Sequence, residues 1–414
     1  MIDKNLFLYD LAVVAIFKNE GRYLKEWLDY HLLAGVDHFY LYNNDSSDDY
    51  KEILAPYVEE NLVTLTELPG KMMQYPAYND AIDKYRFECR YMAFIDLDEF
   101  IFPKTNQSIV TVVDEILNDI PHAAGLGINW QCFGSNGHET ADYSRGVLER
   151  FTRRAPRDWS SHIEGGNFQK KVIDNPRLIH CRTNPHFSFY FYGKSDANSN
   201  GEYISTWYGN KPILADKIVI NHYKTKSKEE YRETKMQRGF ATSDINPYNE
   251  ERFAESDRNE VFDDGILKYR AERAKNFSFE SDEQRISRVI NSLVKVMTSD
   301  ELSLEAALTC RAVAEKFQIK IGDQSAEEIA LAWIYRTLSK SIHRAEIQMF
   351  MKALPQILSR PFPICKEILQ LTQNNLLPRF CEALKNGDVL KGDDDWKARA
   401  EWLYIQQLLS LIKL

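Results

Sequence analysis

Three carboxylates stand close together in the stretch Tyr91–Phe102, which reads YMAFIDLDEFIF. A short apolar run leads into Asp96, Asp98 and Glu99, and such a run predicts a buried strand that ends at the acidic residues. Crowded carboxylates repel one another and resist the loss of water, so they need a compensating cation. Mg²⁺ and Mn²⁺ prefer oxygen ligands and also bind phosphates. The motif therefore predicts a metal ion that holds a nucleotide diphosphate, with a solvated strand end as the alternative.

The elements around this motif alternate between strand and helix. Apolar runs predict strands at Leu11–Phe17, His38–Tyr42, Leu62–Thr66 and Tyr91–Ile95. Periodicity and capping residues predict helices at Arg22–Ala34, from the turn at Asp49 through Tyr57, at Tyr78–Cys89 and at Ser108–Ile120. Such alternation indicates a parallel α/β sheet flanked by helices.

Polar residues follow three of the predicted strands, at Lys18–Glu20, Asn43–Asp45 and Asp96–Glu99. In parallel α/β sheets, ligands lie beyond the carboxyl ends of the strands. We therefore expect the three clusters to face one crevice. Their convergence favours a binding site over a solvated strand end.

The pattern changes after the first half of the chain. Residues 131–167 are rich in Gly, Ser, Arg and Trp and predict a long loop region. Short strands are predicted at Ala123–Trp130, Phe168–Ile173 and Lys217–Ile220, with a turn at Asp196–Gly201. Helical patterns then follow at Glu283–Met297, Ser303–Phe317, Ala326–Leu338, Ala345–Leu358, Ile364–Leu371 and Trp396–Leu414. We predict a catalytic α/β domain over residues 1–258 and an all-helical domain over residues 259–414.

The composition excludes several classes of protein. The net charge is −9, the pI is near 5.6 and no basic cluster stands out, which argues against nucleic-acid binding. The six cysteines form no CxxC pair and indicate free thiols in a reducing compartment, with no zinc site. The N-terminal MIDKNLFLYD lacks the features of a signal peptide, and the early apolar run Leu11–Phe17 is too short to span a bilayer. We therefore expect a soluble, cytoplasmic protein.

The helix predicted at Trp396–Leu414 has a broad apolar surface that could contact a membrane. In its last turns it carries Lys413 as the one cation, whereas interfacial helices favour a basic polar face. A buried helix that closes the helical domain is therefore favoured. Peripheral contact with the inner face of the membrane is the alternative.

Three motifs follow one another along the chain: VVAIFKNEGRYLKEWLDYHLLAGVDHFYLYNNDSSDD, FIDLDEF and INHYKTKSKEEYRETKMQRG. In this order they resemble glycosyltransferase family 92 and the family 2-like glycosyltransferases with a GT-A fold. The resemblance covers roughly residues 10–240 and leaves out the C-terminal helices. It implies a GT-A-type, Rossmann-like and mostly parallel sheet, and an enzyme that uses a nucleotide-sugar donor.

The resemblance also assigns roles to residues of these motifs. Asp96 and Asp98 match the family's DxD motif, which binds Mn²⁺ or Mg²⁺ and the donor diphosphate. Asp98 is the expected direct ligand, Asp96 lies nearer the ribose or donor sugar, and Glu99 orients the loop. His222 stands where such enzymes often carry a third metal ligand, and a neutral imidazole nitrogen suits that role. A structural histidine is the alternative at this position.

Other residues are expected to hold the nucleotide. By the resemblance, the residues expected near the nucleoside follow the first two strands: Lys18, Asn19, Asn43 and Asp45. Lys224, with Lys226 and Lys228 at alternate positions, is expected to neutralise the leaving diphosphate, where negative charge develops. For Lys228, a solvated turn before a helix is an equal alternative.

The catalytic base is predicted among the carboxylates of the loop region. A base must reach the attacking hydroxyl, and Glu164, then Asp158, are the first choices, each against a plain surface role. The chain departs here from the ED motif of inverting family 2 enzymes, so the resemblance does not fix the base. His186 is expected to line the acceptor side or to pack within a loop. Aromatic residues suited to stacking on sugars, or to a core, are Trp130, Trp159, Trp207 and Tyr208.

These features together predict a metal-dependent glycosyltransferase. It would move a hexose from a UDP- or GDP-sugar to a glycan or lipid-linked acceptor in the synthesis of surface polysaccharide or lipopolysaccharide, with inversion implied by the resemblance. A sugar-phosphate nucleotidyltransferase is one alternative, but it needs a glycine-rich loop after the first strand, where this chain has Gly21 alone. An interaction protein with a decayed transferase domain is another, which the intact Asp96, Asp98 and His222 disfavour.

Overall fold

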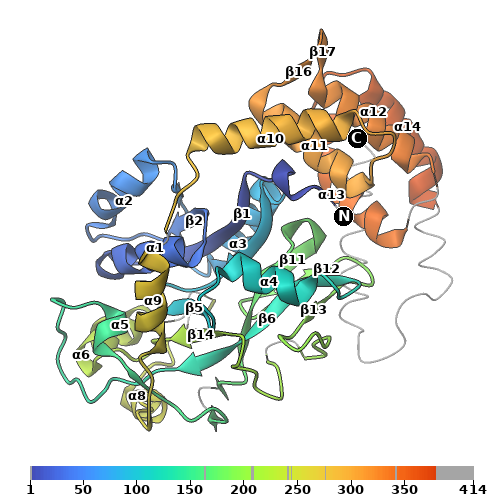
Figure 1. Cartoon of the computed structure of the whole chain (residues 1–414). Coiled ribbons are helices and arrows are strands. Elements are labelled where there is room, and N and C mark those ends of the chain that lie inside the picture. The colour runs from blue at the N-terminus through green and yellow to red at the C-terminus, as the bar shows by residue number, and fades with distance from the viewer. Residues whose placement is uncertain are drawn as a thin grey trace. The chain divides into compact units, whose positions relative to one another are not determined.

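The structure is a computed structural model that describes residues 2–162, 165–206, 209–239, 242–243, 245–275, 277–340 and 343–378 (Figure 1). The chain forms two compact units. The α/β unit comprises Tyr9–Tyr190 and Lys194–Asp282. The helical unit joins the N-terminal residues up to Leu8 and Phe191–Gly193 to the segment that starts at Glu283.

A mostly parallel sheet forms the centre of the α/β unit. Within the described residues it has nine strands: β1 (Tyr9–Phe17), β2 (His38–Asn43), β3 (Val63–Glu67), β4 (Cys89–Phe94), β5 (Glu99–Pro103), β6 (Ala123–Cys132), β10 (Lys170–Asp174), β13 (Ser195–Ala197) and β14 (Ile218–His222). Their order is β3-β2-β1-β4-β10-β6-β14-β5, and β13 pairs with β6. The predicted fold class, a GT-A-type α/β sheet followed by a helical part, is confirmed.

The pairing of the strands combines both directions. Parallel neighbours are β1 with β2 and β4, β2 with β3, and β6 with β13 and β14. Strand β10 runs antiparallel to β4 and β6, and β14 runs antiparallel to β5. The sequence predicted β1–β4 correctly, because β1, β2 and β4 are mostly buried apolar or aromatic runs and β3 is rich in β-branched residues. It missed β5, which forms by pairing with a strand more than a hundred residues later.

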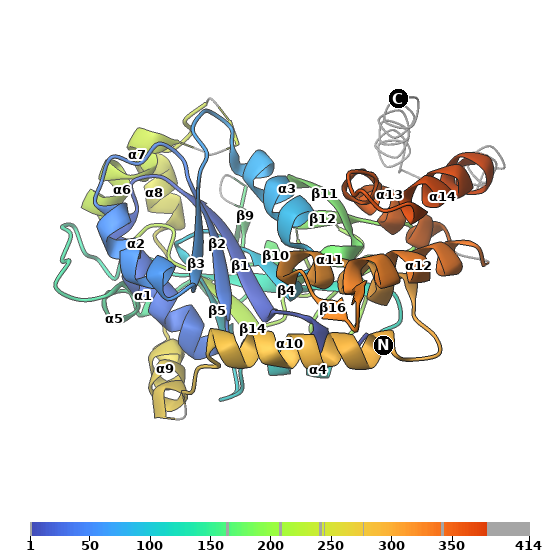
Figure 2. The ribbon, with the colours of Figure 1, turned by 90° about the horizontal axis from the view of Figure 1, so that it is seen from above.

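Helices cover the sheet. The helices of the α/β unit are α1 (Gly21–Ala34), α2 (Tyr50–Glu59), α3 (Gln74–Tyr85), α4 (Ile109–Leu117), α5 (Val147–Arg150), α6 (Lys228–Glu233), α7 (Lys235–Arg238), α8 (Glu250–Ser256) and α9 (Gly265–Lys275). Figure 2 shows α1 and α2 on one side of β1–β3 and α3 on the other. Because α9 packs on α1, the compact α/β unit continues to Asp282. The functional domain boundary predicted after residue 258 stays a prediction.

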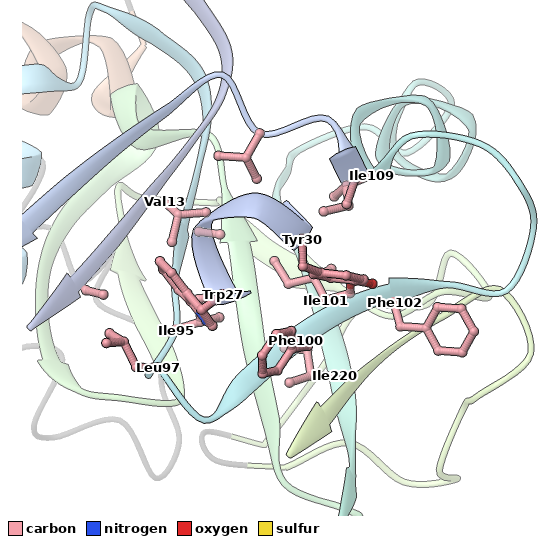
Figure 3. Close-up of a cluster of buried hydrophobic side chains, with 14 of the residues drawn as sticks. Val13, Trp27, Tyr30, Ile95, Leu97, Phe100, Ile101, Phe102, Ile109 and Ile220 are labelled. Carbon is pink, nitrogen blue, oxygen red and sulfur yellow. The ribbon is translucent and has the colours of Figure 1, made fainter. Parts of the chain in front are cut away.

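The apolar face of α1 fixes the start of β5, directly after the acidic motif. Trp27 and Tyr30 project into the cluster of buried side chains in Figure 3. The Trp27 indole donates a hydrogen bond of 2.8 Å to the carbonyl of Glu99, and the Tyr30 hydroxyl donates one of 2.8 Å to that of Ile101. A buried indole N–H or phenol hydroxyl that makes a hydrogen bond fixes the orientation of its aromatic ring. The core thereby positions the chain that carries the carboxylates.

The region predicted as a long loop contains short elements. They are α5, β7 (Arg153–Arg154), β8 (Ser160–Ser161) and β9 (Gly165–Gly166), and β7 pairs with β15 (Val261–Phe262). A hairpin of β11 (Ile179–Asn184) and β12 (Phe187–Tyr190) was not predicted. The predicted turn at Asp196–Gly201 is in part a strand, since β13 includes Asp196.

A buried ion pair holds the start of α6. Glu230 and the N-cap residue Ser227 form a reciprocal capping box. Arg150 donates two hydrogen bonds to the Glu230 carboxylate, at 2.8 and 3.0 Å, and the Tyr23 hydroxyl donates a third at 3.0 Å. Glu230 is fully buried. This network fixes α6 and therefore the beginning of α7.

Replacing Glu230 with glutamine is expected to remove a pH-dependent part of the stability. Burial raises the pKa of Glu230, but Arg150 and Ser227 outweigh burial and lower the pKa to about 2. A carboxyl group with a depressed pKa stabilises the fold above its unfolded pKa of about 4.3, and this contribution is lost as the pH falls toward 2. Urea denaturation at pH 7 should show a loss of about 2–3 kcal/mol that shrinks below pH 4. The exposed Glu139→Gln is the matched control, and a difference that stays constant from pH 7 to pH 3 would contradict the assignment.

The helices of the helical unit are α10 (Asp282–Met297), α11 (Leu304–Phe317), α12 (Ala326–Leu338), α13 (Arg344–Leu358) and α14 (Ile364–Leu371). The first residue of α10, Asp282, still belongs to the α/β unit. A π-helical turn (Thr372–Leu376) and a small hairpin of β16 (Lys320–Ile321) and β17 (Gln324–Ser325) complete the unit within the described residues. These helices agree with the predicted ones within two residues. The short helix Lys4–Leu6 ends just before Phe7. Arg288 of α10 donates a hydrogen bond of 3.0 Å to the carbonyl of Phe7, which connects these N-terminal residues to the helical unit. The helix predicted at Trp396–Leu414 lies outside the described residues.

Within the described ranges, none of the helices has both the length and the hydrophobicity that a bilayer crossing requires.

Candidate active site

A polar cavity of about 670 Å³ lies at the carboxyl ends of the central strands. The loops after β1, β2 and β4 all contribute to its wall, through Lys18 and Glu20, Asn44, and Asp96 and Asp98. The crevice expected from the three polar clusters is therefore present. Parallel pairing of β1 with β2 and β4 brings these ends to one edge.

Strand pairing brings His222 to the acidic motif. In the β5–β14 register, His222 is opposite Glu99, and the backbone N–H of Tyr223 donates to the carbonyl of Asp98 at 2.8 Å. The Nε2 atom of His222 lies 3.6 Å from Oδ1 of Asp98, and both side chains line the cavity. The sequence proposed this pair from a resemblance, and the antiparallel register supplies the physical reason.

Two buried lysines, which sequence reasoning missed, neutralise the carboxylates. Lys171 of β10 donates to Asp96 at 3.0 Å and lies 3.2 Å from Glu99. Lys235 of α7 donates to Oδ2 of Asp98 at 2.5 Å. The signal for Lys171 was present, because a lysine inside a strand predicted to be buried needs a partner.

The acidic turn is also fixed by its own hydrogen bonds. Glu99 accepts a bond of 2.8 Å from the backbone N–H of Asp96, while its own N–H donates to the Asp96 carbonyl at 3.0 Å. Gln74 donates to Oδ1 of Asp96 at 3.1 Å. Glu99 thus holds the turn from behind, in the manner expected of a residue that orients the loop.

These neighbours shift the pKa values of the site. Burial raises the pKa of Asp98, but Lys235 and His222 outweigh burial and hold it well below its usual range. Burial lowers the pKa of His222, but Asp98 outweighs it and raises the pKa to about 10. Glu99 is different, since burial exceeds the effect of Lys171 and raises its pKa to about 7. Asp98 therefore stays ionised through the physiological range.

The residues present fit a divalent cation in part. Oδ1 of Asp98 is buried without a hydrogen-bond partner and faces Nε2 of His222. Mg²⁺ is commonly held by one or two protein ligands together with water and substrate phosphates. Asp98 could supply one ligand, and His222 could supply a second when a bound cation displaces the proton that Asp98 stabilises on its ring. Asp96 is less free, because Lys171 and Gln74 already bind its two oxygens. Among the described residues, no group of three His, Cys, Asp or Glu side chains is arranged to hold a metal ion.

Cations outnumber anions along the cavity. Within the described residues, its wall carries three carboxylates, from Glu20, Asp96 and Asp98, and seven basic side chains: Lys18, Lys71, Lys171, Lys224, Lys235, Arg238 and Arg252. This excess stands out in a chain with a net charge of −9. Burial, with Lys235 nearby, lowers the pKa of Lys224 to about 7, so a bound anion would favour its charged form.

The other predicted lysines lie away from the cavity wall. Lys226 is buried, with its ammonium 4.4 Å from the ring centre of Tyr23. Lys228 lies 3.5 Å from Glu139 and is partly exposed, as expected for the turn before α6.

The remaining residues predicted near the nucleoside connect loops. Asn19 accepts a hydrogen bond of 2.7 Å from the N–H of Ser47, and Asp45 accepts one of 3.0 Å from that of Gly70. Asn43 is buried and donates to Glu67 at 2.6 Å. Their neighbours Lys18 and Asn44 line the cavity instead. A direct contact of Asn19, Asn43 or Asp45 with a nucleoside stays a prediction.

Of the two predicted bases, the structure describes Asp158, and it does not bring this residue to the cavity. Asp158 is exposed and absent from the cavity wall, and Glu164 lies outside the described residues, as do Trp207 and Tyr208. Trp130 forms part of the wall beside His222, with a distance of 4.3 Å between ring centres. Trp159 packs partly buried against the core. His186, which the sequence placed on the acceptor side, also lines the cavity.

A mostly parallel α/β sheet with an acidic turn and a basic cavity at its carboxyl edge is an arrangement suited to binding an anionic ligand beyond the strand ends. Residues 13–255, more than half of the chain, match the model of glycosyltransferase family 92. The chain belongs to this family, which confirms the resemblance and the glycosyltransferase class.

The chain is also similar to individual relatives and to solved structures. A glycosyltransferase family 92 protein of Ricinus communis is 25% identical over 255 residues, which cover 60% of this chain and 41% of that protein. Galactan β-1,4-galactosyltransferase GALS2 of Arabidopsis thaliana is 29% identical over 100 residues, which cover 22% and 19%. The chain thus spans less than half the length of these relatives. A crystal structure of S. aureus TarS with UDP-GlcNAc is 16% identical, with 83% of this chain and 89% of that one covered and a TM-score of 0.33.

Proposed function

We propose that this protein transfers a hexose from a nucleotide-diphosphate sugar to a glycan acceptor, with Mn²⁺ or Mg²⁺ bound, as a step in polysaccharide synthesis. The observation that carries the proposal is the cavity itself. It places a buried, partnerless carboxylate oxygen and an imidazole at one end of a wall rich in lysine and arginine. A metal-bound diphosphate needs this combination of an anionic ligand and surrounding cations.

Asp98 and His222 would hold the metal ion, which supplies a positive charge to the diphosphate when bound. Lys224 and Arg252 line the same wall and would bind the phosphate oxygens as the leaving group gains charge. Lys235 keeps Asp98 ionised in the folded protein. Asp96, held by Lys171 and Gln74, is oriented to accept a hydrogen bond from the ribose or the donor sugar.

The proposal also specifies the class of the sugar donor and of the acceptor. The GALS2 relative is named as a galactan galactosyltransferase, which supports a galactose donor and a polysaccharide acceptor, and we propose a UDP-sugar as that donor. A GDP-sugar donor and a lipid-linked acceptor are the alternatives to be tested. We retain cytoplasmic catalysis as part of the proposal.

Binding of UDP with Mn²⁺ is expected to raise the melting temperature of the protein. A ligand that binds only the folded state stabilises it by mass action, by about 2.7 kcal/mol at a concentration one hundred times its Kd. UDP, GDP, CMP and ADP should be compared by thermal shift, each with Mn²⁺, with Mg²⁺ and with EDTA. We expect the largest shift for UDP with metal, and a clear reduction in EDTA.

Turnover completes this test. Release of UDP from UDP-galactose and UDP-GlcNAc, and of GDP from GDP-mannose, should be measured with β-1,4-galacto-oligosaccharides as acceptors. A larger shift for GDP would change the donor class but keep the function. If no nucleotide shifts the melting temperature and no donor is consumed with either metal, the proposed function is wrong.

A further inference from the structure

We propose that His186 is the general base that takes the proton from the acceptor hydroxyl, an inference that rests on the proposed function. In this step the acceptor oxygen forms a bond to the anomeric carbon, and the bond from that carbon to the diphosphate breaks. The hydroxyl proton moves to Nε2 of His186, and the nucleoside diphosphate leaves with the bonding electron pair. This proposal places the role on an imidazole in the cavity wall in place of the exposed Asp158, while Glu164 lies outside the described residues and stays a prediction.

The carboxylates that line the cavity are already engaged. Within the described residues there are three, and each has a cationic partner: Glu20 with Arg238 at 3.1 Å, Asp96 with Lys171 at 3.0 Å and Asp98 with Lys235 at 2.5 Å. An ion-paired carboxylate is a weak base because its charged form is stabilised. These three residues are therefore poor acceptors for a proton.

The hydrogen bonds of His186 fix its tautomer. Its Nδ1 lies 3.0 Å from the backbone carbonyl oxygen of Lys170. A carbonyl oxygen only accepts, so Nδ1 carries the proton and Nε2 carries a lone pair. Nε2 has no hydrogen-bond partner within the described residues, and the ring lines the cavity. The imidazole thus offers one basic nitrogen, oriented by the bond at the other, which is the arrangement a general base needs.

The backbone and the ring of His186 both have contacts that hold them in place. Its backbone N–H donates to Oδ1 of Asn184 at 2.8 Å, and its carbonyl accepts from Nζ of Lys170 at 3.4 Å. Trp130 packs against the ring edge-on, with 5.2 Å between ring centres, and the other neighbour of Trp130 is His222. Trp130 therefore lies between the proposed base and the proposed metal ligand, and its indole is placed to contact a sugar.

The protonation state of His186 before the donor binds is set mainly by burial, which keeps the imidazole neutral. Burial lowers its pKa to about 3, with further lowering by Lys171 and Lys170 and an opposing effect of Asp96. A bound diphosphate brings negative charge into the same cavity, which raises the pKa of the imidazole toward the working range of a base.

The test compares wild type, His186→Ala and His186→Gln in the full chain, with His138→Ala as the matched control, since His138 packs on Phe151 outside the cavity wall. Nucleoside diphosphate release from the three donors above is measured with Mn²⁺, with and without galacto-oligosaccharide, together with UDP binding by thermal shift. We expect both His186 variants to lose about 10²–10⁴-fold in kcat with unchanged UDP affinity. Added imidazole should restore His186→Ala at least about tenfold, and the acid limb of the wild-type pH–kcat profile, which reports the donor-bound enzyme, should be absent from His186→Gln.

Each outcome decides one question. If His186→Ala keeps kcat within tenfold of wild type, His186 is not the base and the proposed function stands. If UDP binding or the melting temperature falls together with activity, and imidazole does not rescue, His186 is structural. If the wild type consumes no donor, the proposed function fails, and the inference that rests on it fails as well.

Discussion

Replacing Asp98 with asparagine is expected to reduce kcat/KM by about 10²–10³-fold, in line with the loss of one preorganised electrostatic group. The variant keeps the shape of the side chain but removes the charge that pairs with Lys235 at 2.5 Å and faces His222 at 3.6 Å. The metal-dependent part of the UDP thermal shift should disappear, because an amide oxygen is a weaker ligand for a divalent cation. The part of the shift that persists in EDTA should remain.

A control separates this effect from a general change in charge. Asp216 has a side chain that is 75% exposed, and Asp216→Asn should keep the activity and the shift of the wild type. If Asp98→Asn retains a metal-dependent shift equal to that of the wild type, Asp98 is not a metal ligand. Its role would then be confined to the ion pair with Lys235.

Replacing Lys171 with methionine is expected to lower the free energy of unfolding of the α/β unit by about 3–5 kcal/mol, the usual result of removing one member of a buried ion pair. Lys171 is 1% exposed, and its ammonium forms ion pairs with Asp96 at 3.0 Å and with Glu99 at 3.2 Å. Methionine fills a similar volume, so the loss comes mainly from two carboxylates left without their cation. Urea denaturation in EDTA measures the effect.

A second variant tests the cause of that destabilisation. In Lys171→Met/Asp96→Asn the charge left without its cation is removed, because the pKa of Asp96 is lowered and this group is ionised, and part of the lost stability should return. Lys25→Met, whose side chain is 72% exposed, should stay within about 0.5 kcal/mol of the wild type. A Lys171→Met variant as stable as Lys25→Met would show that Lys171 does not compensate the acidic turn.

The sequence determined the elements and the class of this protein. Buried apolar runs such as Leu11–Phe17 predict β1 because a strand covered on both faces leaves a continuous hydrophobic run. Gly35 was expected to end α1, and its φ of 99° is a conformation that glycine adopts without strain. The acidic motif after β4 and the polar residues after β1 and β2 were enough to locate the cavity, since parallel strands bring their ends together.

Only the tertiary structure decided the partners within the site. Lys171 of β10 and Lys235 of α7 meet the acidic motif from 75 and 137 residues further along the chain, and β6 brings Trp130 to His222. Their arrival depends on strand order and register, and local patterns do not contain that information. The same holds for β5, whose short apolar run becomes a strand because β14 pairs with it.

The catalytic base shows most clearly what the sequence determines and what only the tertiary structure decides. Residue type and position in a loop made Glu164 and Asp158 the first choices, yet Asp158 is exposed and does not line the cavity. His186 gains its basic nitrogen from one hydrogen bond to a backbone carbonyl on a different strand. The sequence therefore fixes which groups are available for chemistry, while long-range packing decides which of them face the substrate and in which protonation state, because both depend on neighbours that are distant in the chain.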